Sequence, residues 1–171
     1  MIALFSLSSV YAEHEKVSIL HTKGQQAVGA RFGKGTKNKF DVGLEYELCF
    51  NQRTALLCQI DMERATFGNS DFSNQFLFGG GVEIMCFHPA TWMFIDIDLM
   101  GNVGYDKWTC EALDAEKSGI VGGANVGTTF EFYPTQKLAI VLGAQQYLLF
   151  GNGDSYLKPN FSLGLRYVWN K

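Results

Sequence analysis

Eight carboxylates occupy alternate positions within apolar segments, and they are the residues of this chain best suited to chemistry. They are Glu45, Glu47, Asp61, Glu63, Glu83, Asp96, Asp98 and Glu131. Two arginines, Arg31 and Arg166, occupy similar positions. In one interpretation the carboxylates line a channel for cations or protons. In the other, which we favour, they belong to a filled interior and are neutralised by the arginines, ordered water and shared protons. The acids outnumber the arginines, and such a deficit of positive charge is costly when buried.

The chain lacks the residue arrangements that are typical of enzymes and of metal sites. His14, His21 and His88 fall in the N-terminal tail and in a turn, so no Ser/His/Asp set is anchored to a strand. The pair Cys86 and His88 is isolated, and the four cysteines do not have the spacing of metal ligands. The glycine-rich run 122–127 lacks the lysine and the helix of a phosphate loop. We therefore predict a non-enzymatic protein with no catalytic residue, no metal and no cofactor.

The segment 160–171 shows most clearly which structure carries these residues. Every second side chain is large and apolar: Phe161, Leu163, Leu165, Tyr167 and Trp169. The side chains between them are small or polar, apart from Val168. A period of two indicates a β-strand with different surroundings on its two faces. The apolar face ends in Tyr167 and Trp169, which is typical of the boundary between lipid and water. This pattern predicts the closing strand of a transmembrane β-barrel.

Seven further segments alternate in the same way and bring the number of strands to eight. They cover residues 25–33, 39–50, 55–67, 75–87, 91–105, 119–133 and 138–150. Tight turns follow the second, fourth and sixth strands, whereas longer polar connections follow the first, third, fifth and seventh, as in bacterial outer-membrane barrels. We therefore predict an all-β, eight-stranded antiparallel transmembrane barrel with up-and-down topology over residues 25–171. The interior of a barrel of this size is normally filled by side chains.

The two faces of the strands predict which side meets lipid. Aromatic side chains near strand ends would form a girdle on the lipid-facing surface: Phe40, Tyr46, Tyr105, Phe132, Phe161, Tyr167 and Trp169. A soluble barrel of the lipocalin type would have the opposite polarity, with its apolar face inside. The apolar face here is too bulky for a small lumen, and the other face is rich in Gly, Asp and Glu, so we favour the membrane barrel.

The N-terminus predicts export. Residues 1–12 are apolar and end in Val10-Tyr11-Ala12, which resembles the end of a secretory signal peptide, although the basic region is missing and the true start would lie upstream. Residues 13–24 form a polar lead-in. The sequence thus predicts a cleaved signal peptide and an outer-membrane location. The net charge of −3 gives no reason to expect direct nucleic-acid binding.

Two features in the connections bear on partners and cross-links. The polar insertion 106–118 carries Trp108 and Leu113, which could contact a partner protein, although Trp108 could equally belong to the aromatic girdle. Cys58 and Cys86 would lie almost opposite each other in a hairpin, an arrangement compatible with a disulfide in the periplasm.

The second half of the chain, from about Phe94 to the end, carries a run of glycine and aromatic motifs. They are Gly101-x-x-Gly104-Tyr105-Asp106, Ile120-Val121-Gly122-Gly123-Ala124, Glu131-Phe132-Tyr133, Gln145-Gln146 and Gly164-Leu165-Arg166-Tyr167. In order and spacing they resemble the TraO-type conjugal transfer proteins of Bacteroidetes conjugative transposons. Asn170-Lys171, beyond the last aromatic residue, departs from that pattern.

The resemblance implies a structural outer-membrane component of a mating apparatus, with the lipid bilayer and other conjugation proteins as its partners. It supplies no catalytic residues. The alternative is a small porin-like or ligand-binding outer-membrane barrel that is unrelated to conjugation. The sequence does not indicate an oligomeric state.

Overall fold

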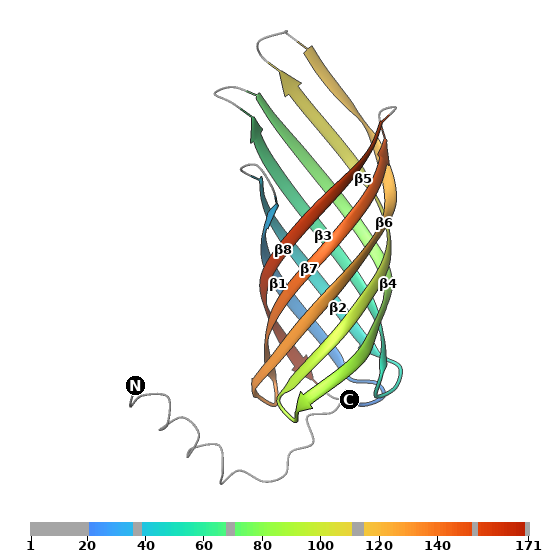
Figure 1. The fold of residues 1–171 in the computed structure, drawn as a ribbon, viewed down its shortest axis with the longest axis vertical. Helices are drawn as coiled ribbons and strands as arrows, with labels where there is room; N and C mark the ends of the chain where they lie inside the picture. Colours follow the sequence, from blue (N-terminus) through green and yellow to red (C-terminus); the bar gives the residue numbers. More distant parts are fainter. Residues whose placement is uncertain (1–20, 36–38, 68–70, 111–114, 152–153, 170–171) are drawn as a thin grey trace, which may run out of the picture.

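Eight antiparallel strands form a closed barrel in the computed structural model, which describes residues 21–35, 39–67, 71–110, 115–151 and 154–169 (Figure 1). Each strand pairs with the next along the chain, and β8 pairs with β1 to close the sheet. This confirms the predicted fold and topology. The strands are β1 (Gln26–Gly35), β2 (Lys39–Cys49), β3 (Thr54–Phe67), β4 (Asp71–Ala90), β5 (Met93–Cys110), β6 (Ala115–Thr135), β7 (Leu138–Gly151) and β8 (Asp154–Trp169).

Side chains alternate between the outside and the inside of the barrel, with the apolar ones outside. On β1, Phe32 is 58% exposed, whereas its neighbour Arg31 is 5% exposed. The same contrast holds on β8, where Leu165 is 57% exposed and Arg166 is 1% exposed. The polarity is therefore opposite to that of a soluble barrel, as the strand pattern predicts. Within the described residues, no helix is long and apolar enough to cross a membrane.

Several strands are longer than the sequence pattern predicts. The predicted insertion 106–118 is mostly strand, because β5 continues to Cys110 and pairs with β6 from Ala115 onwards. β4 begins at Asp71 and β8 at Asp154, both ahead of their predicted starts. Polar side chains end the apolar pattern of a strand, but backbone hydrogen bonding between neighbours continues past them. The alternation of apolar residues thus reports the hydrophobic part of each strand and not its full length.

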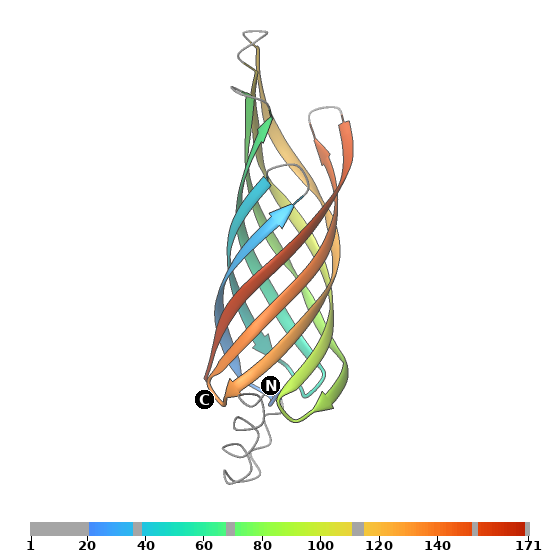
Figure 2. The same ribbon diagram turned by 60° about the vertical axis from the view of Figure 1, so that its left-hand side comes forward.

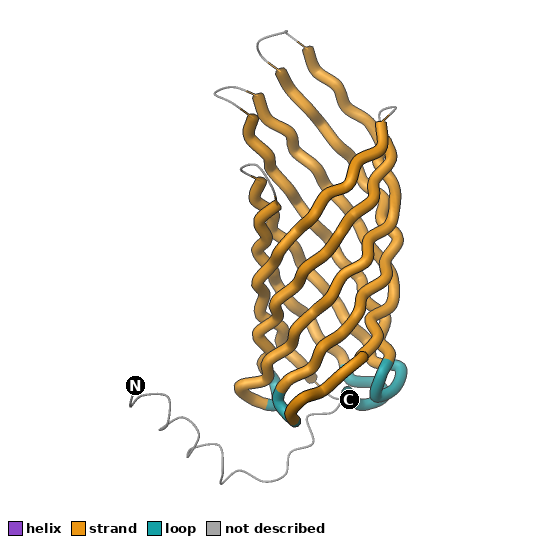
Figure 3. Tube along the Cα trace, in the orientation of Figure 1, coloured by secondary structure: helices purple, strands orange, loops and turns teal. Residues whose placement is uncertain are grey.

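The longest strands rise above the rest of the barrel on one side. Figures 1 and 2 show the β5–β6 hairpin extending furthest, with the β3–β4 hairpin beside and below it, at the end opposite the tight turns. β1 begins and β8 ends at the tight-turn end, where the turns after β2, β4 and β6 also lie (Figure 3). We call the raised part, residues 71–75, 105–110 and 115–120, the strand extension.

Trp108 belongs to this strand extension and not to an exposed loop. It lies on β5 between Ser73 of β4 and Lys117 of β6, and its side chain is half-buried. Trp108 shares the inner face of β5 with Asp106 and Asn102, because it is an even number of residues away from both. The prediction that Trp108 lies in a loop is therefore wrong, and so is its alternative place in the outer girdle. Leu113 and the predicted signal peptide 1–12 lie outside the described residues.

Cys58 and Cys86 are both free thiols. The residue opposite Cys58 on β4 is Gly80, because the β3–β4 register starts from Thr54 opposite Ile84. The sequence suggested a register in which the two cysteines would face each other, and the structure does not have that register.

Gly81 marks a place where two strands approach too closely for a side chain. A Cβ added there would lie 2.0 Å from the carbonyl oxygen of Leu99, whereas one added at neighbouring Gly80 would meet nothing within 4 Å. We expect Gly81→Ala to lower the free energy of unfolding by about 1–3 kcal/mol, because backbone must move to relieve the clash. Gly80→Ala is the matched control and should change it by less than about 0.5 kcal/mol. Urea unfolding in micelles, followed by tryptophan fluorescence, measures both; equal effects would contradict the expected close approach.

Candidate functional site inside the barrel

All ten charged residues that the sequence assigns to the interior have side chains inside the barrel, and none is more than 9% exposed. They come from β1, β2, β3, β4, β5, β6 and β8, at the positions of each strand that alternate inward. Closure of the barrel brings them together across the lumen, where two clusters form, one around Arg31 and one around Arg166. Not every acid belongs to one of them, since Glu63 pairs with Lys158.

Arg166 is the centre of the cluster nearer the tight-turn end. Its Nε donates a hydrogen bond to Glu45 Oε1 at 2.8 Å, and its Nη1 donates one to Glu47 Oε2 at 2.6 Å. Nη1 also donates to Glu131 and lies 3.5 Å from an oxygen of Glu83. One guanidinium from β8 therefore contacts carboxylates of β2, β4 and β6, which suits its planar set of donors.

Arg31 organises the second cluster. Its Nη2 donates to both oxygens of Asp61, at 2.7 and 2.8 Å, and its Nη1 donates to Gln145 Oε1 at 3.0 Å. Tyr147 donates its hydroxyl to the same Gln145 oxygen at 2.8 Å. Strands β1, β3 and β7 are thereby linked across the lumen. Gln145 and Tyr147 complete this cluster, and the sequence does not predict an interior place for either of them.

Lys158 is a further inward cation, which lies outside the predicted strands. It is 5% exposed, and its Nζ lies 2.5 Å from Glu63 Oε2 and donates to Gln75 Oε1 at 2.9 Å. Lys158 precedes the predicted start of the last strand, although it lies an even number of residues from Arg166 and so has the same inward direction. Nearby on β8, Asn160 donates to Asp41 at 2.5 Å.

His21 enters the tight-turn end of the barrel from the lead-in segment and is only 3% exposed. Its Nε2 donates to Glu131 Oε2 at 3.0 Å, and its ring stacks on Phe94 with centroids 5.0 Å apart. Burial acts to lower the pKa of His21, but the hydrogen bond to Glu131 and the charges of Glu131, Glu47 and Asp96 raise that pKa to about 9. The sequence predicts that this histidine lies in the N-terminal tail, and only the fold brings it to Glu131, 110 positions away.

Two apolar clusters bracket the arginine clusters within the lumen. At the tight-turn end, Phe94 and Tyr133 pack with small apolar residues of β1, β7 and β8. Towards the other end, Leu77, Val121 and Leu149 pack around Tyr147. A lumen that holds charged clusters between apolar layers is filled by side chains, as is usual for barrels of eight strands.

Positive charge inside the barrel still falls short of the negative charge. The buried side chains of the described residues include nine carboxylates, which are Asp41 and the eight acids predicted to face inward, against four basic groups, His21, Arg31, Lys158 and Arg166. Both carboxylate oxygens of Glu83, and both of Asp96, lack a hydrogen-bond partner. These groups can hold protons or a cation.

The predicted girdle residues all lie on the outer surface. Phe40, Tyr105, Phe161 and Tyr167 are exposed, and Tyr46, Phe132 and Trp169 are half-buried. Tyr167 stacks on Trp169 with ring centroids 6.2 Å apart, and Trp92 packs beside Phe132 near the same end. Aromatic residues near both ends of the apolar surface are typical of barrels that span a bilayer.

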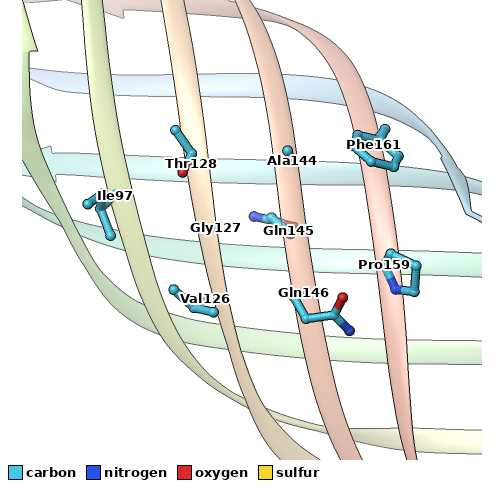
Figure 4. Close-up of a pocket in the computed structure, with 9 residues that line it drawn as sticks. All are labelled: Ile97, Val126, Gly127, Thr128, Ala144, Gln145, Gln146, Pro159 and Phe161. Atoms are coloured by element: carbon cyan, nitrogen blue, oxygen red, sulfur yellow. The ribbon is translucent and has the colours of Figure 1, made fainter.

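The outer surface also has a shallow groove of about 350 Å³ (Figure 4). Thr128 and Ala144 form its floor, and Ile97, Val126 and Phe161 stand around them. The Gln146 amide at its edge donates to the backbone carbonyl of Tyr147 at 3.2 Å. The groove therefore offers an apolar surface suited to a lipid chain and not a set of polar groups that converge on a ligand.

Comparisons with known proteins connect this chain to others through structure. No family model and no curated protein matches it. Among solved structures, Ail, the attachment invasion locus protein of Yersinia pestis, is 16% identical, with a TM-score of 0.60 over 86% of this chain and 100% of that chain. Neisserial surface protein A is 9% identical, with a TM-score of 0.65 over 84% of this chain and 94% of that chain.

A third similar structure is the N-terminal β-barrel domain of Pseudomonas aeruginosa OprF, which is 9% identical, with a TM-score of 0.63 over 86% of this chain and 98% of that domain. At such low identities the likeness concerns the fold alone. The lack of a matching family model leaves the TraO-type resemblance without support beyond the motifs themselves. The chain has the fold of the small eight-stranded barrels of bacterial outer membranes.

Proposed function

We propose that this chain is an integral outer-membrane protein with a sealed interior and a structural role, in which it anchors in the bilayer and holds the strand extension outside. The observation that carries the proposal is the reversed polarity of the barrel. Leu44, Met62 and Leu163 are 60%, 64% and 55% exposed, while charged side chains fill the interior. Exposure of so large an apolar surface to water is unfavourable, whereas contact with lipid is favourable. Barrel closure also leaves no unpaired strand edge within the bilayer.

Location in the outer membrane requires export, which we assign to a cleaved signal peptide over residues 1–12. The expected result is that the protein remains in the outer-membrane fraction after alkaline or urea washing and leaves it only with detergent. Recovery in the periplasmic fraction without detergent would instead support a soluble ligand-binding barrel.

The filled lumen argues against a porin. Purified protein reconstituted in planar bilayers is expected to show no steady ion conductance, because Arg31 and Arg166 span the lumen between two apolar layers. A cation-selective current that falls in Glu45→Ala or Asp98→Ala would contradict a sealed interior and establish the porin-like alternative.

The strand extension is the part of the barrel that we propose for contact with partners. Its base carries the exposed apolar residues Tyr105 and Ile120, and Trp108 is a half-buried aromatic residue on its inner face. Aromatic residues are frequent anchors of protein interfaces. We keep Trp108 and Leu113 as the proposed contact residues, and Trp108→Ala should weaken partner capture without altering the barrel.

A role in conjugation is the more specific form of this proposal, and it is supported by the motif resemblance from about Phe94 onwards. If the protein is a component of a mating apparatus, deleting its gene should abolish DNA transfer from the donor, and a copy in trans should restore it. Normal transfer from a deletion strain with intact membranes would exclude that role and leave the barrel's anchoring function unaffected.

A further inference from the structure

A mixed set of metal-binding side chains meets at the tight-turn end of the lumen. One ring nitrogen of His21, one carboxylate oxygen of Glu47 and the sulfur of Cys49 lie within 4.8 Å of one another, and all three residues are buried. The lead-in segment supplies the histidine, and inward-facing positions at the end of β2 supply the other two. Nitrogen, oxygen and sulfur from three such residues form a ligand set that zinc accepts.

The buried carboxylates around these three side chains are not fully neutralised by basic groups. Glu47 shares a second group with Glu83 and Glu131, whose carboxylate oxygens also lie within 4.8 Å of one another. Glu83 is 2% exposed, and neither of its oxygens has a hydrogen-bond partner, although Arg166 Nη1 lies 3.5 Å from one of them. Asp96, 0% exposed, also has no hydrogen-bond partner on either oxygen. Carboxylates in such a state are costly to bury unless a proton or a cation accompanies them.

Arg166 does not fill the space between His21, Glu47 and Cys49, because it binds only one of the two oxygens of Glu47. Oε2 accepts a hydrogen bond from Arg166 at 2.6 Å, while Oε1 accepts one from the Cys49 thiol at 3.0 Å. The metal would therefore take Oε1 and leave the arginine contact in place. Glu131 and Tyr133 lie beside the His21 ring and fix its orientation, as the outer hydrogen-bond partners of metal-bound histidines do.

We propose that His21, Glu47 and Cys49 bind a zinc ion, which ties the lead-in segment to the end of the barrel. In a tetrahedral site with Zn–O of about 2.0 Å and Zn–S of about 2.3 Å, the oxygen and the sulfur lie about 3.5 Å apart. In the structure Cys49 Sγ and Glu47 Oε1 are 3.0 Å apart, with the thiol proton between them. The two atoms therefore need to separate by roughly half an ångström for the metal to take the place of that proton. Cys49 binds as thiolate through a sulfur lone pair, and its proton passes to solvent together with any proton held by the ligating nitrogen of His21.

The test is titration of the purified full-length protein, refolded in detergent micelles, with zinc alone and then with cobalt(II) alone. Wild-type protein is expected to bind one ion, and the cobalt form is expected to show a thiolate-to-metal charge-transfer band. Cys49→Ser should abolish that band, and His21→Ala should raise the zinc Kd by about a hundredfold or more, since losing even an outer partner costs about 10- to 100-fold. His21 precedes β1, so His21→Ala leaves every strand intact.

The matched control is a variant in which Cys58, Cys86 and Cys110 are all serine, so that Cys49 is the only cysteine. It should retain the stoichiometry, the affinity and the charge-transfer band. Circular dichroism and resistance to unfolding in SDS show whether each variant is folded. The proposal is overturned if wild-type protein binds no zinc, if binding survives in folded Cys49→Ser and His21→Ala variants, or if the band disappears from the single-cysteine variant.

Discussion

Replacing Arg166 with methionine is expected to lower the free energy of unfolding by about 3–5 kcal/mol, because it leaves buried carboxylates without their partner. Arg166 is 1% exposed, and its guanidinium contacts Glu45, Glu47 and Glu131. Methionine fills a similar volume but supplies no charge and no donor. The three acids cannot turn towards water, because the barrel wall and the apolar layer around Phe94 enclose them.

Urea unfolding in micelles at pH 7, followed by tryptophan fluorescence, measures this effect. Arg166→Lys is expected to cost less, because lysine keeps the charge but cannot bond several carboxylates with a planar group. Arg64→Met is the matched control, since Arg64 lies on the outer face over the Phe72 ring, and it should change stability by about 1 kcal/mol or less. A loss below about 1 kcal/mol in Arg166→Met would show that the interior acids are neutralised by other means.

Placing an arginine on the outer face of β8 is expected to give the second large effect. Leu163 lies on β8, six residues from Trp169 at the strand end, and is 55% exposed. Six residues of a tilted strand cover roughly half of the apolar band of about 25 Å, which places Leu163 near the middle of the bilayer. Leu163→Arg should therefore lower the free energy of unfolding, measured in lipid vesicles, by about 2–4 kcal/mol.

Leu157→Arg on the same strand and face is the matched control. Leu157 is 69% exposed and lies six residues further from the tight-turn end, near the opposite boundary of the apolar band. Its substitution should cost only about 0–1 kcal/mol, because arginine there reaches water. Equal costs at the two positions, measured by reversible unfolding in vesicles, would contradict the placement of this face in lipid.

The sequence by itself determined the number of strands, their order and the direction of their side chains. Those properties depend on a period of two, which any single strand displays, and on turn residues that are neighbours in the chain. The inward position of Arg31, Asp61 and Arg166 followed in the same way. The sequence pattern did not determine the true ends of β4, β5, β6 and β8, because paired strands continue where the apolar pattern stops.

Only the tertiary structure decided which inward residues meet. Arg166 contacts Glu45 across 121 positions of the chain, and His21 contacts Glu131 across 110. Such pairs are set by the shear and closure of the barrel, which no local pattern records. The same closure brings His21 from a segment without strand character to Glu47 and Cys49, which is why a chain without metal-ligand spacing holds a proposed zinc site.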